Sequence, residues 1–276
     1  MQTLRDKLYM PIYAGKRSAA PPVKITIIGA GAVGMATAFS LLTKGIPTEL
    51  VLVDLDVDKV EAEVNDLQNA RQFLPKVAIY GGSIDVLAYV SWRISGFPKN
   101  RILGLGTLLD SSKFCNAISK KLGLSADSVS GYLLGEQGEK AVPIWSSVTC
   151  AGLKLRSIYP EIGTPDDKEG YNKIPQELLE KGKGANAWAV GLATSVICEA
   201  LLSDANCVFP LSIHAKHEGK LTGLQGVDKD IFFSLPCIVN TNGVRGIMIQ
   251  QLDDDEKEKL FVSAKKMEEL LQSIEW

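Results

Sequence analysis

Hydrophobic and polar positions follow two repeating patterns in the first quarter of the chain. Val23–Ile28 and Glu49–Asp54 are short runs rich in β-branched residues, which predict buried strands. Each run is followed by apolar residues at helical spacing, which predict helices over Val33–Lys44 and Val57–Ala70. The order strand, helix, strand, helix favours an α/β fold in which helices cover a parallel sheet.

The pattern changes after this first unit. Val77–Tyr80 predicts a third strand, but Gly81 and Gly82 follow it and Ser83–Val90 has helical spacing, so the parallel sheet is expected to stop early. The rest of the chain mixes both patterns, typical of an α+β region. Strands or their beginnings are predicted at Arg101–Gly106, Tyr132–Gly135, Ile144–Trp145 and Ile231–Val239, and helices at Ser111–Lys121 and Asp253–Ser273.

The N-terminal segment 1–22 is polar and mixed, and its last residues, Pro21 and Pro22, favour an extended entry into the first strand. We interpret this segment as an arm outside the core. The predicted organisation is then an arm (1–22), a Rossmann-type domain (23–107) and a second domain (108–276).

Composition limits the classes of partner. Lysine and arginine total 30 against 32 acidic residues, so a net charge of -2 gives no reason to expect nucleic acid or an anionic membrane as a partner. The five cysteines are scattered and odd in number, which argues against a disulfide framework or a thiolate metal site. With neither a secretory signal nor a membrane-length apolar run, the expected location is cytoplasmic.

A glycine motif lies between the first strand and its helix. Gly29, Gly31 and Gly34 have the G-x-G-x-x-G spacing, with Val33 inside it. Such a motif alone is a weak signal, because three glycines can serve a turn. Asp54 strengthens it, since a carboxylate about 20 residues further on, at the end of the second strand, accepts hydrogen bonds from the ribose hydroxyls of NAD. The sequence therefore predicts NAD binding.

Several longer segments, in order, resemble the L-lactate/malate dehydrogenase family, and the animal L-lactate dehydrogenases most of all. The similar segments are Met1–Leu8, Lys24–Met35, Asp66–Gln68, Trp92–Arg101, Leu109–Ser111, Trp188–Leu192 and Leu235–Ile238. The resemblance covers nearly the whole chain. It implies a Rossmann NAD-binding domain, a C-terminal substrate domain at 108–276, and hydride transfer between nicotinamide and a 2-hydroxy acid such as lactate.

The resemblance also implies positions for the catalytic groups. The family's proton-exchanging histidine lies in a G-E-H-G string, where this chain has Gln137, and an amide cannot act as general acid or base. Asp110 matches the aspartate that orients that histidine. Lys113 stands in place of an arginine that grips the substrate carboxylate, so the charge is kept and the two-pronged geometry is lost.

Two further positions and one absence follow from the same resemblance. Asn186 replaces a threonine near the substrate, and Val190 matches the aliphatic residue packed on the nicotinamide. Between Gly82 and Ser83 nothing matches the family's central strands and its mobile catalytic loop. A deletion in the chain and an omission of residues from the printed sequence both explain this gap.

Weaker signals have ordinary explanations. His214 and His217, beside Glu218, resemble a metal cluster, but solvated side chains are the simpler interpretation. Cys150 and Cys237 lie in apolar surroundings and are interpreted as small core residues. The acidic run 253–256 is interpreted as the first turn of the last helix, where negative charge is favourable.

Three functions remain open. The first is a pseudoenzyme that keeps the NAD(H)-binding scaffold but has lost hydride transfer or performs it very slowly. The second is an active NAD-dependent L-lactate dehydrogenase or a related 2-hydroxy-acid oxidoreductase with another proton donor. The third is a non-catalytic interaction protein. The resemblance implies pyruvate, lactate or another 2-oxo acid as ligand and a homo-oligomer, dimer or tetramer, as the assembly.

Overall fold

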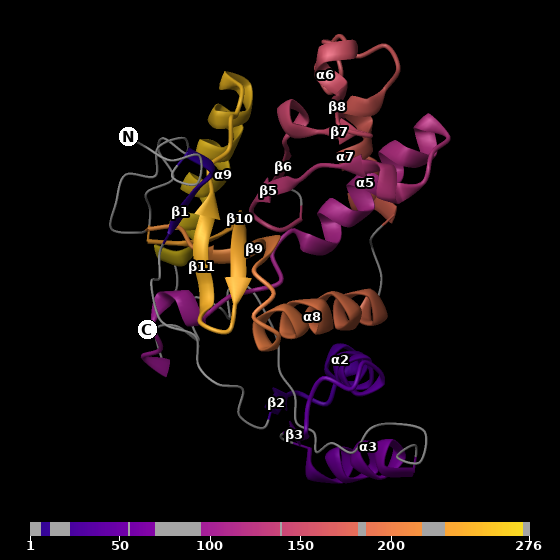
Figure 1. Cartoon of the computed structure of the whole chain (residues 1–276), viewed down its shortest axis with the longest axis vertical. Helices are drawn as coiled ribbons and strands as arrows, with labels where there is room; N and C mark the ends of the chain where they lie inside the picture. The colour runs from indigo at the N-terminus through magenta and orange to yellow at the C-terminus, as the bar shows by residue number, and fades with distance from the viewer. Residues whose placement is uncertain are drawn as a thin grey trace.

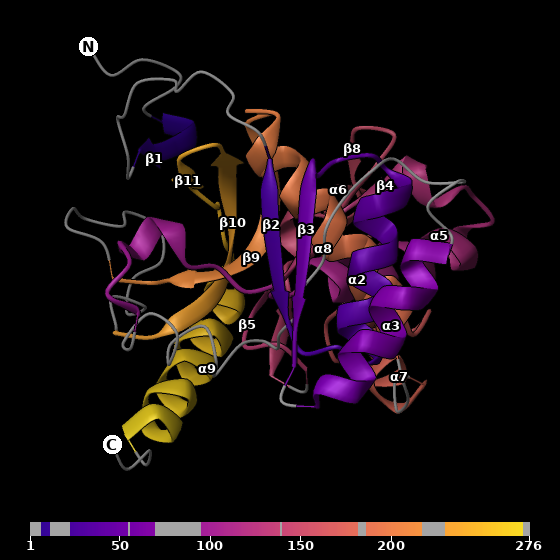
Figure 2. The ribbon, with the colours of Figure 1, turned by 90° about the horizontal axis from the view of Figure 1, so that it is seen from below.

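The computed structural model covers residues 1–276 and describes residues 7–11, 23–54, 56–69, 95–138, 140–181, 186–216 and 230–272. Figure 1 shows a small strand-and-helix unit at the bottom, an antiparallel sheet above it, and a helical lobe beside that sheet. Turned by 90°, the molecule presents the two strands of the small unit side by side in front of the rest (Figure 2).

The small unit contains the first predicted elements, and all four are confirmed. They are β2 (Lys24–Ile28), α2 (Ala32–Thr43), β3 (Glu49–Val53) and α3 (Val57–Asn69). The strands β2 and β3 pair in parallel, as a right-handed strand–helix–strand unit requires. Leu41 of α2 and Leu50 and Leu52 of β3 are almost fully buried between strands and helices.

The prediction that β2 is a buried strand is wrong. Only Ile27 of this strand is buried, and Ile28 is 64% exposed. Its register partner Val53 is 42% exposed. A buried strand of a parallel sheet normally has helices on both faces and a neighbouring strand on each side. Among the described residues, β2 pairs with β3 alone. The predictions for 77–80 and 83–90, and the junction at 82/83, lie outside the described residues.

The antiparallel sheet forms the centre of the molecule. Its strands follow the order β1-β11-β10-β5-β6, and β9 also pairs with β10. The bounds are β1 Tyr9–Pro11, β5 Leu133–Gly135, β6 Ala141–Pro143, β9 Cys207–His214, β10 Phe232–Asn240 and β11 Gly243–Met248. The strands predicted at 132–135 and 231–239 are thus confirmed as β5 and β10. Every residue of β10 is buried, because neighbouring strands and helices surround it.

Two predicted strands are wrong. The run 101–106 forms a single bridge, Gly104 to Ser212, preceded by a 3-10 turn, η2 (Lys99–Arg101). Two glycines in this short run leave little side-chain surface to pair along a strand. Ile144 and Trp145 follow β6 and lead into another 3-10 turn, η4 (Trp145–Ser147), in which Trp145 is buried.

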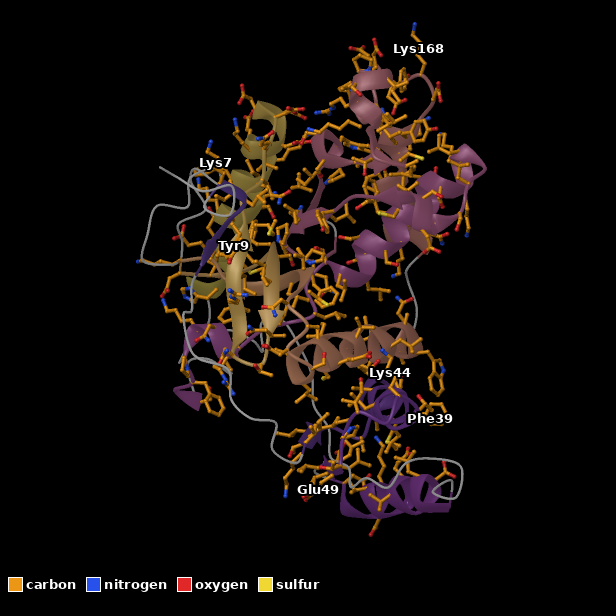
Figure 3. All side chains as sticks on the ribbon, in the orientation of Figure 1. Lys7, Tyr9, Phe39, Lys44, Glu49 and Lys168 are labelled. Carbon is orange, nitrogen blue, oxygen red and sulfur yellow. The ribbon has the colours of Figure 1, made fainter. Side chains whose placement is uncertain are left out.

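The N-terminal segment has a role that the sequence did not predict. Its described part, residues 7–11, contains β1, which pairs antiparallel with β11 at the edge of the central sheet. The Ile249 amide also donates to the Leu8 carbonyl. Tyr9 lies beside this sheet in Figure 3. This part of the predicted arm is therefore an edge strand of the same chain.

The helical lobe has its own core around Phe114, Ile118 and Trp145. The Phe114 and Trp145 rings meet edge to face at 4.9 Å between centroids. The helix predicted at 111–121 is confirmed as the central part of α5. The lobe consists of α5 Leu108–Leu122, η3 Ala126–Ser128, β4 Val129–Ser130, β7 Thr149–Cys150, β8 Leu153–Lys154, α6 Leu155–Ile158, η5 Tyr171–Lys173 and α7 Ile174–Lys181.

Helix α8 (Ala187–Leu202) joins the parts by lying directly against α2 (Figure 1). A Cβ atom on Gly191 would lie 2.5 Å from the Ala36 backbone carbon, so the two helices approach more closely than any other residue would permit. Lys44, the residue that caps the end of α2, pairs with Glu199 of α8 at 2.8 Å, and Figure 3 shows Lys44 at this contact. The small unit is therefore fixed to the central sheet through α8.

The C-terminal helix is confirmed as α9 (Asp254–Gln272), with three acidic residues in its first turn. It packs along β5 and β6 and contributes Leu260 and Ala264 to the main core. No helix in the described part of the chain combines the length and apolar composition needed to cross a membrane.

Candidate functional site

The turn between β2 and α2 has the geometry that its glycines predicted. Gly29 adopts φ +111°, which a side chain would disfavour, and its amide donates to the Val53 carbonyl. A Cβ on Gly34 would lie 2.0 Å from the Gly29 carbonyl oxygen, so only glycine lets the helix begin this close to the turn. Around Gly31 a Cβ would meet no atom within 4 Å, which leaves open space at the backbone.

The start of α2 is suited to an anion. Its N-cap is Gly31, which has no side chain to cap the helix, and the first turn contains no acidic residue. The amides of the first turn, including that of Val33, point out of the helix end, where the helix dipole favours negative charge. Together with the open space at Gly31, this end fits a pyrophosphate.

Asp54 lies at the carboxyl end of β3, next to the same turn. Its Oδ2 accepts a hydrogen bond of 2.6 Å from the Ala30 amide, and its Oδ1 accepts one of 3.3 Å from the Asp56 amide. A carboxylate offers about four acceptor positions, so further hydrogen bonds from ribose hydroxyls remain feasible. The glycine turn, the helix end and this carboxylate form one continuous cradle for a dinucleotide.

A second group of predicted residues lies where α5 meets β5. The Ser111 hydroxyl accepts from the Leu133 amide at 2.9 Å, and the Thr107 hydroxyl donates to the Leu133 carbonyl. These bonds fix the first turn of α5 against β5 and so fix Asp110 relative to the turn that follows β5. Sequence reasoning missed both anchors, although two hydroxyl residues flanking Asp110 are a visible signal.

Asp110 is paired within its own helix. The Lys113 Nζ lies 3.7 Å from the Asp110 Oδ1, one turn along α5, and both side chains are about three-quarters buried. The i,i+3 spacing brings such residues to the same face of a helix. The two charges therefore neutralise each other at the position where the sequence predicted a carboxylate and a separate substrate-binding cation.

Gln137 lies in the turn between β5 and β6 and is exposed. Its side chain makes no hydrogen bond to another described residue. Its neighbour Glu136 is half-buried, and burial raises the pKa of that carboxyl, partly offset by Lys140 and Lys266. Lys266 belongs to α9, so the charges near Glu136 come partly from that helix. The charge near Asp110 is instead Lys113 of α5.

Asn186 and Val190 occupy the beginning of α8. Asn186 is the exposed N-cap residue, its side chain makes no capping bond, and its carbonyl accepts from the Val190 amide at 2.9 Å. Val190 is partly buried against the main core. Since α8 rests on α2, this helix start is linked mechanically to the helix that follows the glycine turn.

Two of the weaker interpretations need comment. His214 is not a solvated side chain, because it is fully buried at the end of β9, where packing against Phe232 excludes water. His217 and Glu218 lie outside the described residues, and within the described part no cluster suited to a metal ion occurs. Cys237 is fully buried, as predicted, and burial raises its pKa to about 12, whereas Cys150 is only partly buried.

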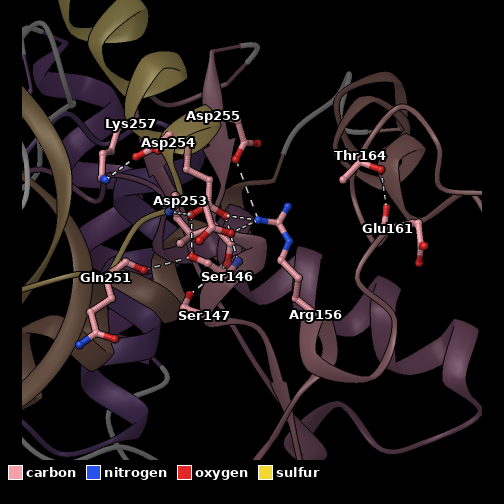
Figure 4. Close-up of polar contacts among 12 residues, drawn as sticks. Ser146, Ser147, Arg156, Glu161, Thr164, Gln251, Asp253, Asp254, Asp255 and Lys257 are labelled. Atoms are coloured by element: carbon pink, nitrogen blue, oxygen red, sulfur yellow. Dashed lines mark hydrogen bonds and ion pairs between the residues drawn. The ribbon is translucent and has the colours of Figure 1, made fainter.

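The acidic start of α9 belongs to a charged network that was not predicted in full (Figure 4). Glu256 is 1% exposed and accepts from the Ser146 amide at 2.9 Å and the Asp253 amide at 3.0 Å. Arg156 bonds to Asp253 and lies 3.6 Å from Glu256. The network ties α9 to η4 and α6.

The fold and the cradle define the class of this protein, which is an α/β protein with an NAD-binding domain at the N-terminal side of a second α/β domain. The family model for the lactate/malate dehydrogenase NAD binding domain matches residues 23–83. The model for the lactate/malate dehydrogenase alpha/beta C-terminal domain matches residues 107–275, more than half of the chain.

The chain therefore belongs to the lactate/malate dehydrogenase family. It is 33% identical to the L-lactate dehydrogenase B chain of Monodelphis domestica over 328 residues, which cover 96% of each chain. Identity to the B chain of Homo sapiens is 32% with the same coverage. To that of Xenopus laevis it is 34% over 331 residues and 97% of each chain.

These matches also bear on the predicted gap. The alignment with the Monodelphis protein spans 328 positions whereas this chain has 276 residues, so at least 52 aligned positions (328 less 276) have no residue here. The NAD binding domain model stops at residue 83, next to the predicted junction. The shortfall and the end of this match fit a gap near Gly82 and Ser83, and a deletion at that junction stays a prediction.

Proposed function

We propose that this chain is an NAD(H)-binding pseudoenzyme of the lactate/malate dehydrogenase family, in which hydride transfer to a 2-oxo acid is lost or very slow. The observation that carries the proposal is Gln137, an exposed amide in the turn after β5, at the position that the resemblance gives to the proton-exchanging histidine. Bound NADH would supply the hydride. Reduction of a carbonyl also needs a proton, and an amide has none to give near neutral pH.

The Asp110–Lys113 pair supports the same proposal. In the family arrangement, the aspartate stabilises a protonated histidine, and a separate cation holds the substrate carboxylate. Here the carboxylate and the ammonium lie 3.7 Å apart and satisfy each other. A substrate carboxylate would have to compete with Asp110 for Lys113, and lysine lacks the bidentate geometry of arginine. Substrate binding at this position is therefore expected to be weak.

The shortened chain contributes a second deficit. The resemblance assigns the missing positions to central strands and to a loop that closes over the substrate with a carbonyl-polarising arginine. A closing loop excludes water and completes the catalytic arrangement. The exposed Ile28 and Val53, at the ends of the two described parallel strands, fit the loss of neighbouring strands.

An active L-lactate dehydrogenase, or a related 2-hydroxy-acid oxidoreductase, is the second candidate. The observation that favours it, besides the names of the relatives, is Glu136, whose raised pKa suits a proton donor better than an ordinary carboxyl. The charges near Glu136 are Lys140 and Lys266, whereas the charge near Asp110 is Lys113, where the resemblance places the substrate carboxylate. Glu136 therefore has different charged neighbours from the predicted substrate position, and the first proposal is preferred. Loss of NADH binding would instead favour the third candidate, a non-catalytic interaction protein.

The experiment measures NADH binding by fluorescence and NADH oxidation with pyruvate, at high protein concentration, for the unaltered chain and Gln137→His. Gln137→Asn is the matched control, because it keeps an amide. NADH should bind to all three proteins and turnover should be undetectable in the unaltered chain and the control. Turnover in the ordinary range of about 1–10³ per second in the unaltered chain would refute the proposal, and its loss in Glu136→Gln would identify the donor.

The variant also separates the two deficits. General acid–base catalysis contributes roughly 10²–10⁴-fold in rate. A gain of that size in Gln137→His assigns the loss to the amide. No gain, with NADH still bound, assigns it to the missing loop and to Lys113, and the double variant with Lys113→Arg then tests the substrate-binding part.

Location and assembly belong to the same proposal. All five cysteines are free thiols, which suits a reducing, cytoplasmic compartment. The proposed ligand is pyruvate, lactate or another 2-oxo acid, with no nucleic acid or membrane partner. The proposed assembly is a homo-oligomer, a dimer or a tetramer. A monomeric mass by light scattering would refute it.

A further inference from the structure

The turn that carries Gln137 is held by a side chain of the C-terminal helix. Gln137 lies between Glu136 and Lys140, in the turn from β5 to β6. The Glu136 amide donates to the Ser263 hydroxyl at 3.3 Å, and that hydroxyl donates to the Lys140 carbonyl at 3.2 Å. A hydroxyl has one proton to give and lone pairs that accept, so this single side chain satisfies both backbone groups. Ser263 therefore spans the two ends of the turn.

The register of the hairpin shows what the hydroxyl replaces. In an antiparallel ladder, every second pair of opposite residues is hydrogen-bonded. The Ile144 amide donates to the Tyr132 carbonyl at 3.0 Å. Counting along the register in steps of two from this pair, Glu136 and Lys140 are the next but one hydrogen-bonded pair. The Ser263 hydroxyl is inserted where their direct bond would form, and it keeps the two sides of the turn apart.

The helix α9 gives this hydroxyl a fixed place. Glu256, Leu260 and Ser263 follow one another at spacings of four and three residues, which puts them on one face of the helix. Glu256 accepts from the Ser146 amide, and Leu260 belongs to the main core. Ser263 is 3% exposed, and a Cβ on Gly135 would lie 3.1 Å from its hydroxyl oxygen. The end of β5 is therefore packed directly against the serine.

We propose that Ser263 is a positioning residue, which sets the place of Gln137 by holding its turn open. The inference rests on the part of the proposed function in which a 2-oxo acid binds at the family's site. There the NH₂ group of Gln137 donates a hydrogen bond to the carbonyl of the acid. Without the Ser263 hydroxyl, Glu136 and Lys140 bond directly, the turn narrows and Gln137 moves away from the ligand.

Nuclear magnetic resonance of the ¹⁵N-labelled chain with bound NADH tests this role. Pyruvate is titrated while the side-chain amide signals of Gln137, identified by their absence in Gln137→His, are followed. Ser263→Ala removes the hydroxyl and Ser263→Thr keeps it. Ser119→Ala is the matched control, because Ser119 is also buried but its hydroxyl bonds to the Asn116 carbonyl of its own helix.

Pyruvate should shift the Gln137 signals at the same midpoint concentration in the unaltered chain, Ser263→Thr and Ser119→Ala. In Ser263→Ala the midpoint should rise about tenfold, the factor that one hydrogen bond is worth, while the Kd for NADH stays unchanged. Equal midpoints in Ser263→Ala and Ser119→Ala would overturn the proposal. So would a loss that Ser263→Thr does not restore, or the absence of any pyruvate response at Gln137. Consumption of NADH in the same samples would instead refute the proposed loss of hydride transfer.

Discussion

Substitution of Glu256 by glutamine tests the charged network at the start of α9. The carboxylate is almost fully buried, and each of its oxygens accepts from a different backbone amide, Oε1 from Ser146 and Oε2 from Asp253. The bond to Asp253 is half of a capping box, in which the acid at the third helical position bonds back to the N-cap amide. The network therefore stabilises both the helix end and its attachment to η4.

The magnitude follows from the shape of an amide. Glutamine has nearly the same size, but one carboxylate oxygen becomes an NH₂ group. In either orientation of the amide, that group faces a backbone N–H, so one buried donor loses its acceptor, which costs about 1–3 kcal/mol. Arg156, 3.6 Å away, also loses a charged partner. Glu256→Gln should therefore lower the free energy of unfolding by about 1–3 kcal/mol, and Glu256→Ala by about 3–5 kcal/mol.

Urea unfolding followed by circular dichroism measures both variants. Glu258→Gln is the matched control, because Glu258 is exposed on the same helix, and its effect should stay within about 0.5 kcal/mol. If Glu256→Gln unfolds at the same urea concentration as the control, the network contributes nothing and the hydrogen-bond argument fails.

Three further outcomes are expected. Gly191→Ala gains about 1 kcal/mol of helix propensity, but it forces a Cβ against the Ala36 backbone, which costs about 1–3 kcal/mol. The variant should therefore unfold at a lower temperature, and an unchanged thermal midpoint would contradict the close contact. Burial would raise the pKa of Asp167, but hydrogen bonds from the Gly163 and Asn172 amides to its carboxylate hold the pKa below the usual range. The stability that this carboxylate contributes is therefore present above about pH 4 and is lost as the pH falls through the folded pKa. Asp167→Asn should weaken the acid dependence of urea unfolding, and an identical pH profile would contradict this. Asp54→Ala removes hydrogen bonds worth about 1.5–3 kcal/mol and should raise the Kd for NADH at least about tenfold in a fluorescence titration; equal affinity would show that the carboxylate does not contact the cofactor.

The first unit of the fold could be predicted because its local signals agree with one another. β-branched runs, helical spacing and glycines all assigned the same boundaries, and β2, α2, β3 and α3 fall within one or two residues of them. Its exposure could not be predicted. Whether Ile28 is covered depends on which strands lie beside β2, and that is a property of segments elsewhere in the chain.

The candidate site divides in the same way. The cradle at Gly29, Gly34 and Asp54 depends on nearby backbone, so the motif was sufficient to predict its geometry. The pairing of Asp110 with Lys113 was visible as an i,i+3 spacing, yet the resemblance drew attention to each residue's separate role. The burial of His214 depends on Phe232 and Asp230, which are brought to it by sheet register, and no local pattern signals that.

The pairing of β1 with β11 has a consequence for how the chain folds. Tyr9 leaves the ribosome long before its partner Met248 is made. Local contacts form early, and contacts between distant residues must wait for loop closure. The small unit, with its short-range strands and helices, can form during synthesis, but the edge of the central sheet stays incomplete until β11 has been made. During that interval the growing chain exposes an unpaired strand edge, which is where chaperone protection matters most.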